Sequence, residues 1–354
     1  MRGRALALVA FAPLFVHGAD DPSRQGSLAT GVRVERVVVD AYVTDRRGDP
    51  IPNLTAADFR VKADGKLVSL EAADWIPADK PEVEPMMAVP PPEGVGENGG
   101  PSSAATVPEA PPGRLLVFFF QTDFTRQRAK GQMQMANEAH RLLDRLLPSD
   151  RVAVLSFDSH LHLHLDFTND REAIQHAVFD SLRIGEMPMR CAGTSPSLPS
   201  IAARFDFAAA KKAYDVERGL EVLAEALKGI PSAKSLLYFG WGFRVDGSPR
   251  EDTHLREALA AMAEARMAVF TIDVTWADYH TLESELIQVA ELTGGSHHTT
   301  FRLPLAALDA VGRALGGRYV LVFVKPDGPP GVHEIDVDLV GRKGTVTARP
   351  FYLD

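Results

Sequence analysis

The chain contains one cysteine in 354 residues, Cys191, so no disulfide can form within it. Stability therefore has to come from a buried apolar core, and 45% hydrophobic residues can supply one at this length. Cys191 lies in PMRCAGTSPS, where no obvious catalytic partner accompanies it. We interpret this thiol as incidental.

An excess of basic residues is also missing. Lys and Arg number 38 against 47 Asp and Glu, which gives a formal charge of −9, and no basic run occurs. Binding to phosphates requires clustered positive charge, so we expect no nucleic-acid partner.

Long apolar runs are absent beyond the N-terminus, so we expect no transmembrane segment in the mature chain. Residues 1–19 have a basic start at Arg2 and Arg4, an apolar stretch over 5–16 and small residues ending at Ala19. This layout is typical of a secretory signal peptide, the alternative being a frayed apolar terminus. We expect an exported protein, periplasmic or extracellular.

Known catalytic motifs are missing as well. The sequence has no Gly-x-Ser-x-Gly elbow, no His-Glu-x-x-His pair and no phosphate-binding glycine loop. We therefore predict that the protein is not an enzyme, and keep a hydrolase of unknown substrate as an alternative.

Two short β segments flank the rest of the chain. Apolar residues alternate in 32–76, where Asp64-Gly65 predicts a hairpin, and again in 317–354, where one last strand is expected over 346–351. Neither segment has enough strands for a stable sheet, so we predict that they pair in one β-sandwich. Residues 77–113, rich in Pro, Gly and Ser, predict a disordered linker.

Strand and helix patterns alternate through residues 114–316. Buried-strand runs occur at 115–120, 152–157, 236–239 and 268–272, and each is followed by a helical pattern. This order predicts an α/β domain with a doubly wound, mostly parallel sheet covered by helices on both faces. The polar alternation of 160–167 indicates an antiparallel edge strand.

Several motifs resemble one family. They are VVVDAYVTDRRGDPIPNLTAADFRVKADGK, DRVAVLSFDS, LDFTNDREAI, SAKSLLYFGWGFR and GGRYVLVFVKP. Together they resemble exported bacterial proteins, common in acidobacterial genomes, that carry a domain related to von Willebrand factor A (VWA). The resemblance covers 32–76 and 114–354, and it implies a Rossmann-like VWA fold.

The family resemblance also implies a metal-ion-dependent adhesion site (MIDAS) that this chain has in degenerate form. The family's Asp-x-Ser-x-Ser turn reads Gln121, Asp123 and Thr125 here; Thr194 matches the family threonine, and Trp241 stands where an acidic residue is expected. A neutral amide is a poor ligand for a hard cation, so we predict no cofactor. An unconventional Mg²⁺ site at Asp123, Thr125 and Thr194 is the alternative.

The loops that follow the strands form a candidate binding face. We predict a secreted, non-enzymatic protein-binding or adhesion module, with a metal-dependent adhesion domain as the runner-up. Trp241 is either an exposed anchor of this face or a plug that fills the vacated metal position. The face comprises Gln121, Thr122, Asp123, Thr125, Thr194, Trp241, Asp273 and Trp276, and His280 can extend it.

Histidines form a second pattern. Strand alternation would place His160, His162 and His164 on one face, where imidazoles can bind Zn²⁺ or Cu²⁺. An ordinary polar face is the commoner explanation. A tetrahedral site would need a further ligand, which the pair His297-His298 can supply only if it folds nearby.

Overall fold

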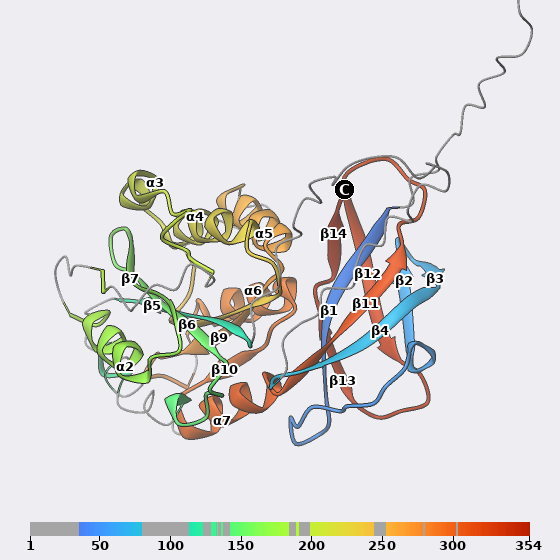
Figure 1. The fold of residues 1–354 in the computed structure, drawn as a ribbon, viewed down its shortest axis with the longest axis horizontal. Helices are drawn as coiled ribbons and strands as arrows, with labels where there is room; N and C mark the ends of the chain where they lie inside the picture. Colours follow the sequence, from blue (N-terminus) through green and yellow to red (C-terminus); the bar gives the residue numbers. More distant parts are fainter. Residues whose placement is uncertain are drawn as a thin grey trace, which may run out of the picture. The chain divides into compact units, whose positions relative to one another are not determined.

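A six-stranded sheet lies at the centre of the α/β domain (Figure 1). The computed structural model describes residues 35–79, 113–122, 129–131, 133, 136, 142–183, 189–190, 199–243, 253–278, 280–301 and 304–354. The strand order is β10-β9-β8-β5-β6-β7, and all neighbours are parallel except β7, which pairs antiparallel with β6 at the edge. The strands are β5 (Leu115–Gln121), β6 (Arg151–Phe157), β7 (Leu161–Thr168), β8 (Lys234–Gly240), β9 (Met267–Asp273) and β10 (His297–Thr299).

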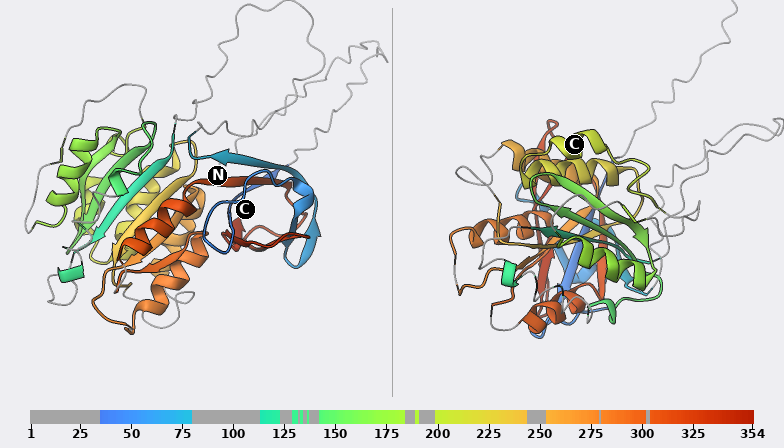
Figure 2. Two further views of the ribbon diagram at one scale, coloured as in Figure 1. Left: turned by 90° about the horizontal axis from the view of Figure 1, so that it is seen from below. Right: turned by 90° about the vertical axis from the view of Figure 1, so that its left-hand side faces the viewer.

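Helices cover both faces of this sheet (Figure 2). One core contains side chains of α3, α4, α5 and α6, and the other contains side chains of α2 and α7. Every residue of β5, β8 and β9 is buried, which explains the uninterrupted apolar run of at least four residues within each strand. The helices are α2 (Arg171–Asp180), α3 (Phe207–Lys212), α4 (Val216–Lys228), α5 (Thr253–Glu264), α6 (Glu283–Thr293) and α7 (Pro304–Ala314).

Local sequence signals fix several helix ends. Asp170, Asp206 and Asp215 are the N-caps of α2, α3 and α4, and each carboxylate accepts a backbone N–H of the first turn. Helix α6 ends at Gly294, whose φ of 79° is left-handed and suits glycine.

Strands from both ends of the described chain form two antiparallel sheets. Their orders are β13-β1-β11-β4 and β14-β12-β2-β3, so each sheet combines early and late strands around a shared apolar core. A short helix η1 (Ala56–Asp58) precedes β2. The fold-class prediction is confirmed. The strands are β1 (Arg36–Thr44), β2 (Phe59–Ala63), β3 (Lys66–Val68), β4 (Leu70–Pro77), β11 (Gly317–Val324), β12 (Val332–Leu339), β13 (Thr345–Ala348) and β14 (Phe351–Leu353).

Three elements differ from the sequence prediction. The single strand expected over 346–351 is two strands in different sheets, separated at Pro350, which has no N–H for a strand ladder. Helix α3, which has Ala213 as its C-cap, was missed. Strand β10 was missed because three residues are too few for a periodic pattern.

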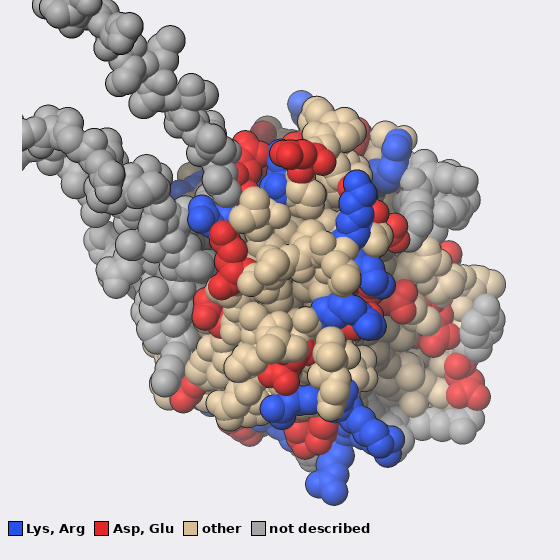
Figure 3. Space-filling model, turned by 90° about the vertical axis from the view of Figure 1, so that its right-hand side faces the viewer, with Lys and Arg blue, Asp and Glu red and all other residues tan. Residues whose placement is uncertain are grey.

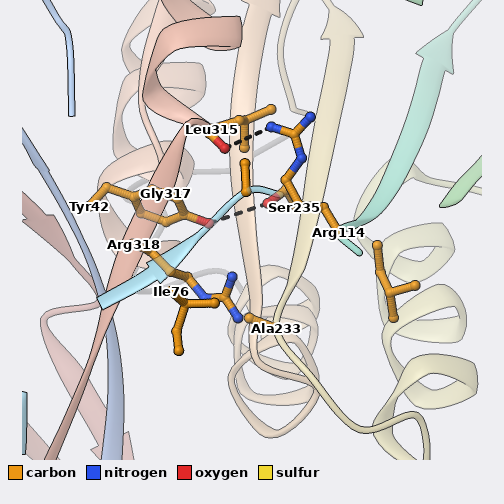
Figure 4. A pocket seen from close by; sticks show the side chains of 10 residues that line it. Tyr42, Ile76, Arg114, Ala233, Ser235, Leu315, Gly317 and Arg318 are labelled. Carbon is orange, nitrogen blue, oxygen red and sulfur yellow. Dashed lines mark hydrogen bonds between the residues drawn. The ribbon is translucent and has the colours of Figure 1, made fainter. Parts of the chain in front are cut away.

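Buried charge joins the sandwich to the α/β domain, and residues 35–354 form one compact unit. The Asp40 carboxylate lies 2.8 Å from Arg266 Nη2 and 3.0 Å from Arg318 Nε. Burial raises the pKa of Asp40, but the two guanidinium groups outweigh it and hold the pKa far below its usual value. Tyr42 Oη lies 3.3 Å from Ser235 Oγ beside a small pocket (Figure 4).

Charges of both signs are interspersed on the face that Figure 3 shows. The exposed ion pairs of the sandwich include Arg60–Asp338 and Lys62–Asp336, each 2.8 Å apart. Exposed pairs of this kind contribute little to stability. Among the described residues, no helix combines the length and apolarity needed to cross a membrane. The predicted signal peptide and residues 80–112 of the predicted linker lie outside the described residues.

Candidate functional site

Gln121, the predicted leading position of a degenerate MIDAS, is turned inward. Gln121 is 6% exposed, and its Oε1 accepts hydrogen bonds from Tyr238 Oη at 2.8 Å and from the backbone N–H of Trp241 at 3.0 Å. Packing is tight at this point, since a Cβ on Gly240 would lie 2.6 Å from the same oxygen. The amide oxygen is therefore engaged by donors inside the protein.

The residues next to Gln121 are also enclosed. Thr122 donates from its N–H and from its Oγ1 to the Phe157 carbonyl, at 2.8 and 3.2 Å. Trp241 is 8% exposed, so its burial supports the plug and not the exposed anchor. Three predicted site residues, Asp123, Thr125 and Thr194, lie outside the described residues.

Asp273 ends β9 at the same edge of the sheet and is 1% exposed. Its Oδ1 accepts the Thr275 N–H at 2.8 Å, and its Oδ2 lies 2.8 Å from His280 Nε2. The loops after β8 and β9 are joined by the Val274 N–H, which donates to the Gly240 carbonyl at 2.9 Å. Both carboxylate oxygens of Asp273 thus organise the loop.

Among the described residues of the predicted face, Trp276 is the exposed one, at 39%. The Lys130 ammonium lies 4.0 Å from the centre of its ring, and Phe301 meets it edge-on with centroids 5.9 Å apart. The sequence reasoning missed Lys130 and Phe301, because nothing in their spacing links them to Trp276. The structure brings all three together after β5, β9 and β10.

A second polar group lies in the β6–β7 hairpin, and β6 is the neighbour of β5 in the sheet. One ligand atom from each of Asp158, His160 and His162 lies within 4.8 Å of the others. His162 Nε2 is 3.1 Å from Asp158 Oδ1, and His160 Nδ1 is 3.7 Å from it. Asp158 was not among the predicted ligands.

Asp158 is held as an anion. Burial raises its pKa, but the Ser159 N–H and the His162 imidazole outweigh this effect and bring the pKa to about 2. The Ser159 hydroxyl also donates to Oδ1, at 3.1 Å.

The predicted histidine row needs correction. His164 is 4% exposed, and its Nε2 lies 2.7 Å from Ser156 Oγ, so it is engaged with the neighbouring strand β6. The pair His297-His298 cannot supply a ligand, because β10 is at the opposite edge of the sheet. Five strand spacings separate these edges, about 24 Å.

No family model matches the sequence, and no curated protein matches it. Among solved structures, BatB of Bacteroides thetaiotaomicron, a conserved hypothetical protein, is 12% identical with a TM-score of 0.38; the match covers 57% of this chain and 97% of BatB. A von Willebrand factor type A structure from Catenulispora acidiphila is 12% identical with a TM-score of 0.42, over 69% of this chain and 66% of that one. Proximal thread matrix protein 1 of the mussel byssus, with a zinc-occupied MIDAS motif, is 14% identical with a TM-score of 0.40, over 59% and 48%. These values describe similarity of fold alone.

Proposed function

We propose that this chain is an exported, non-enzymatic protein-binding module whose VWA-like domain contacts its partner through the loops at the carboxyl ends of the sheet strands. Export is supported by the predicted signal peptide, and the absence of a catalytic motif supports a binding role.

The exposed Trp276 is the observation that carries this proposal. An indole that is 39% exposed, with a lysine over its ring and a phenylalanine at its edge, offers a large amphipathic contact. Tryptophan is enriched among residues that dominate interface energies, because it buries much apolar area with few rotatable bonds. A partner segment with an apolar side chain beside an acidic one would match Trp276 and Lys130.

The MIDAS position supports binding that needs no cation there. Gln121 Oε1 already accepts two hydrogen bonds, and Trp241 is buried beside it. A ligand-bridging Mg²⁺ at this position would require the amide to break both bonds and then to act as a weak ligand. The proposal therefore assigns recognition to the aromatic group around Trp276.

The test is affinity capture from the envelope fraction of the source organism, using the full-length protein and two variants. Trp276→Ala removes the exposed indole. Leu67→Ala is the matched control, because Leu67 is an apolar side chain 71% exposed on β3 of the sandwich. Removing an interface anchor typically costs about 2 kcal/mol or more, which weakens affinity roughly thirtyfold.

We expect wild type and Leu67→Ala to capture one protein that Trp276→Ala does not capture. The same difference should hold when the captured protein is purified and tested for binding. Equal capture by all three proteins would show that the loop face is not the binding surface. Absence of any specific capture in wild type would contradict the protein-binding function itself.

A further inference from the structure

The β6–β7 hairpin presents three metal-binding side chains at the surface. Asp158 lies in the turn, His160 ends it, and His162 is the second residue of β7. Leu161 and Leu163 alternate with the histidines and pack in the core on the other face, so the leucines fix the direction of the imidazoles. Throughout the described ranges, no other three such residues bring their ligand atoms this close.

We propose that Asp158, His160 and His162 bind one divalent transition-metal ion, with Zn²⁺ the ion that their chemistry fits best. The metal site is independent of whether Trp276 contacts a protein.

The spacing of the ligand atoms suits tetrahedral coordination. Zn²⁺ bonds of about 2.0–2.1 Å place neighbouring ligand atoms about 3.4 Å apart. The two distances to Asp158 Oδ1, 3.1 and 3.7 Å, bracket this value, and no pair exceeds 4.8 Å. The two imidazole centroids are already 3.9 Å apart with ring planes at 46°, so a small rotation of the rings closes the site.

The donor set favours zinc over magnesium. Two imidazole nitrogens and one carboxylate oxygen are typical zinc ligands, whereas Mg²⁺ and Ca²⁺ prefer sites made of oxygen alone. Hydrogen bonds from the turn fix the carboxylate before any ion arrives, because the Ser159 N–H and hydroxyl both reach Asp158 Oδ1. Preorganisation of this kind strengthens metal binding.

The site is accessible to an ion. The side chains of Asp158, His160 and His162 are 38, 21 and 14% exposed. The contact between His162 Nε2 and Asp158 Oδ1 is a hydrogen bond, so the metal would take the place of the shared proton. Three protein ligands leave a fourth position for water or for a side chain of another molecule.

The experiment is calorimetric titration of ZnCl₂ into the full-length protein, treated with EDTA and carrying no polyhistidine tag. We expect one equivalent of Zn²⁺ per chain. Asp158→Asn keeps the size and the hydrogen-bond acceptor of the turn but removes the charge, and it should weaken binding by more than about tenfold. His162→Ala should abolish the one-to-one binding.

Two control variants sharpen the assignment. His176 on α2 lies 3.7 Å from the single carboxylate of Glu172, with a side chain 56% exposed, so His176→Ala should leave Zn²⁺ binding unchanged. His164→Gln should also leave it unchanged, because that imidazole is engaged with Ser156. Loss of binding in His164→Gln would instead favour the three-histidine row.

Folding is checked by circular dichroism. If His162→Ala fails to fold, Asp158→Asn decides the question with Co²⁺ as a spectroscopic probe, because the visible absorption of tetrahedral Co²⁺ should appear in wild type and change in the variant. The proposal would be overturned if Asp158→Asn bound Zn²⁺ one-to-one with the affinity of wild type, or if wild type showed no stoichiometric binding.

Discussion

The two edge strands of the six-stranded sheet both carry neighbouring histidines, in opposite surroundings. At β7, His160 and His162 lie beside Asp158 in an open hairpin. At β10, His297 and His298 lie against α6 and α7. There His297 Nδ1 is 3.0 Å from Thr271 Oγ1, and His298 Nε2 is 2.8 Å from Ser296 Oγ.

The difference shows what decides whether a polar side chain can act as a ligand. Hydroxyl groups contact imidazoles in both places, since Ser159 Oγ lies 3.2 Å from His160 Nδ1, but the hairpin imidazoles also lie beside a carboxylate that solvent reaches. Gln121 differs from the hairpin in charge and exposure, because it is a buried neutral amide whose oxygen accepts two hydrogen bonds, whereas Asp158 is a carboxylate that solvent reaches. Polar side chains in these places are therefore either engaged inside the protein or accessible to a ligand. Substitutions of the two kinds should change stability by different amounts.

The largest expected effect is a loss of stability at acidic pH caused by His298 of β10. Burial, with the charges of His297 and Arg313, lowers the pKa of His298 to about 4. Between about pH 6.5 and 4 the unfolded chain then binds more protons at this residue than the folded chain does. Its contribution to stability is complete above pH 6.5 and falls as the pH drops, by at most about 3.5 kcal/mol at 1.4 kcal/mol per pKa unit.

This expectation can be measured as the denaturation midpoint in urea at pH 7.5, 6 and 5. His298→Gln retains a hydrogen-bonding group for Ser296 but does not titrate, so its stability should decline less with acidification than that of wild type. Other titrating groups cancel in the difference between the two proteins. Identical pH profiles would contradict the burial of a neutral His298.

An intermediate effect is expected at Gln121, the last residue of β5. Gln121→Leu removes the acceptor of the buried backbone N–H of Trp241 and should lower the free energy of unfolding by about 1–3 kcal/mol. His160→Gln, at the open hairpin, should change it by less than about 0.5 kcal/mol. Thermal unfolding of both variants in EDTA gives the comparison, and similar losses would remove the distinction between engaged and accessible groups.

The smallest effect should come from magnesium. A specific site on the folded protein would add about 2.7 kcal/mol of stability at a hundredfold excess over its dissociation constant. We expect no change in melting temperature with Mg²⁺. A rise that Asp123→Ala abolishes would establish the unconventional cation site and exclude a degenerate one.

Much of the fold was predictable because its signals are local. The apolar run of β5 and the Asp64-Gly65 turn between β2 and β3 each identified an element from a few neighbouring residues. Strand β10 escaped because its three residues acquire strand geometry only by pairing with β9.

The candidate sites were less predictable, because they depend on which side chains meet. His160 and His162 could be recognised by spacing, but Asp158 joins them only when the hairpin closes. His164 has the same sequence spacing and stacks on His162, but it is buried and its Nε2 contacts Ser156. Trp276 was identified from its loop position, whereas Phe301 reaches it from a loop beyond β10.

The pairing of β4 with β11 places the entry and exit of the α/β domain side by side. Pro77, the last residue of β4, is the register partner of Gly317, the first residue of β11. Antiparallel partners lie about 5 Å apart, a gap that a two-residue turn can close. An Asn-Gly turn is thus long enough to join β4 directly to β11, and the same position could receive another domain whose ends meet, provided that the buried Asp40 keeps a partner in place of Arg266.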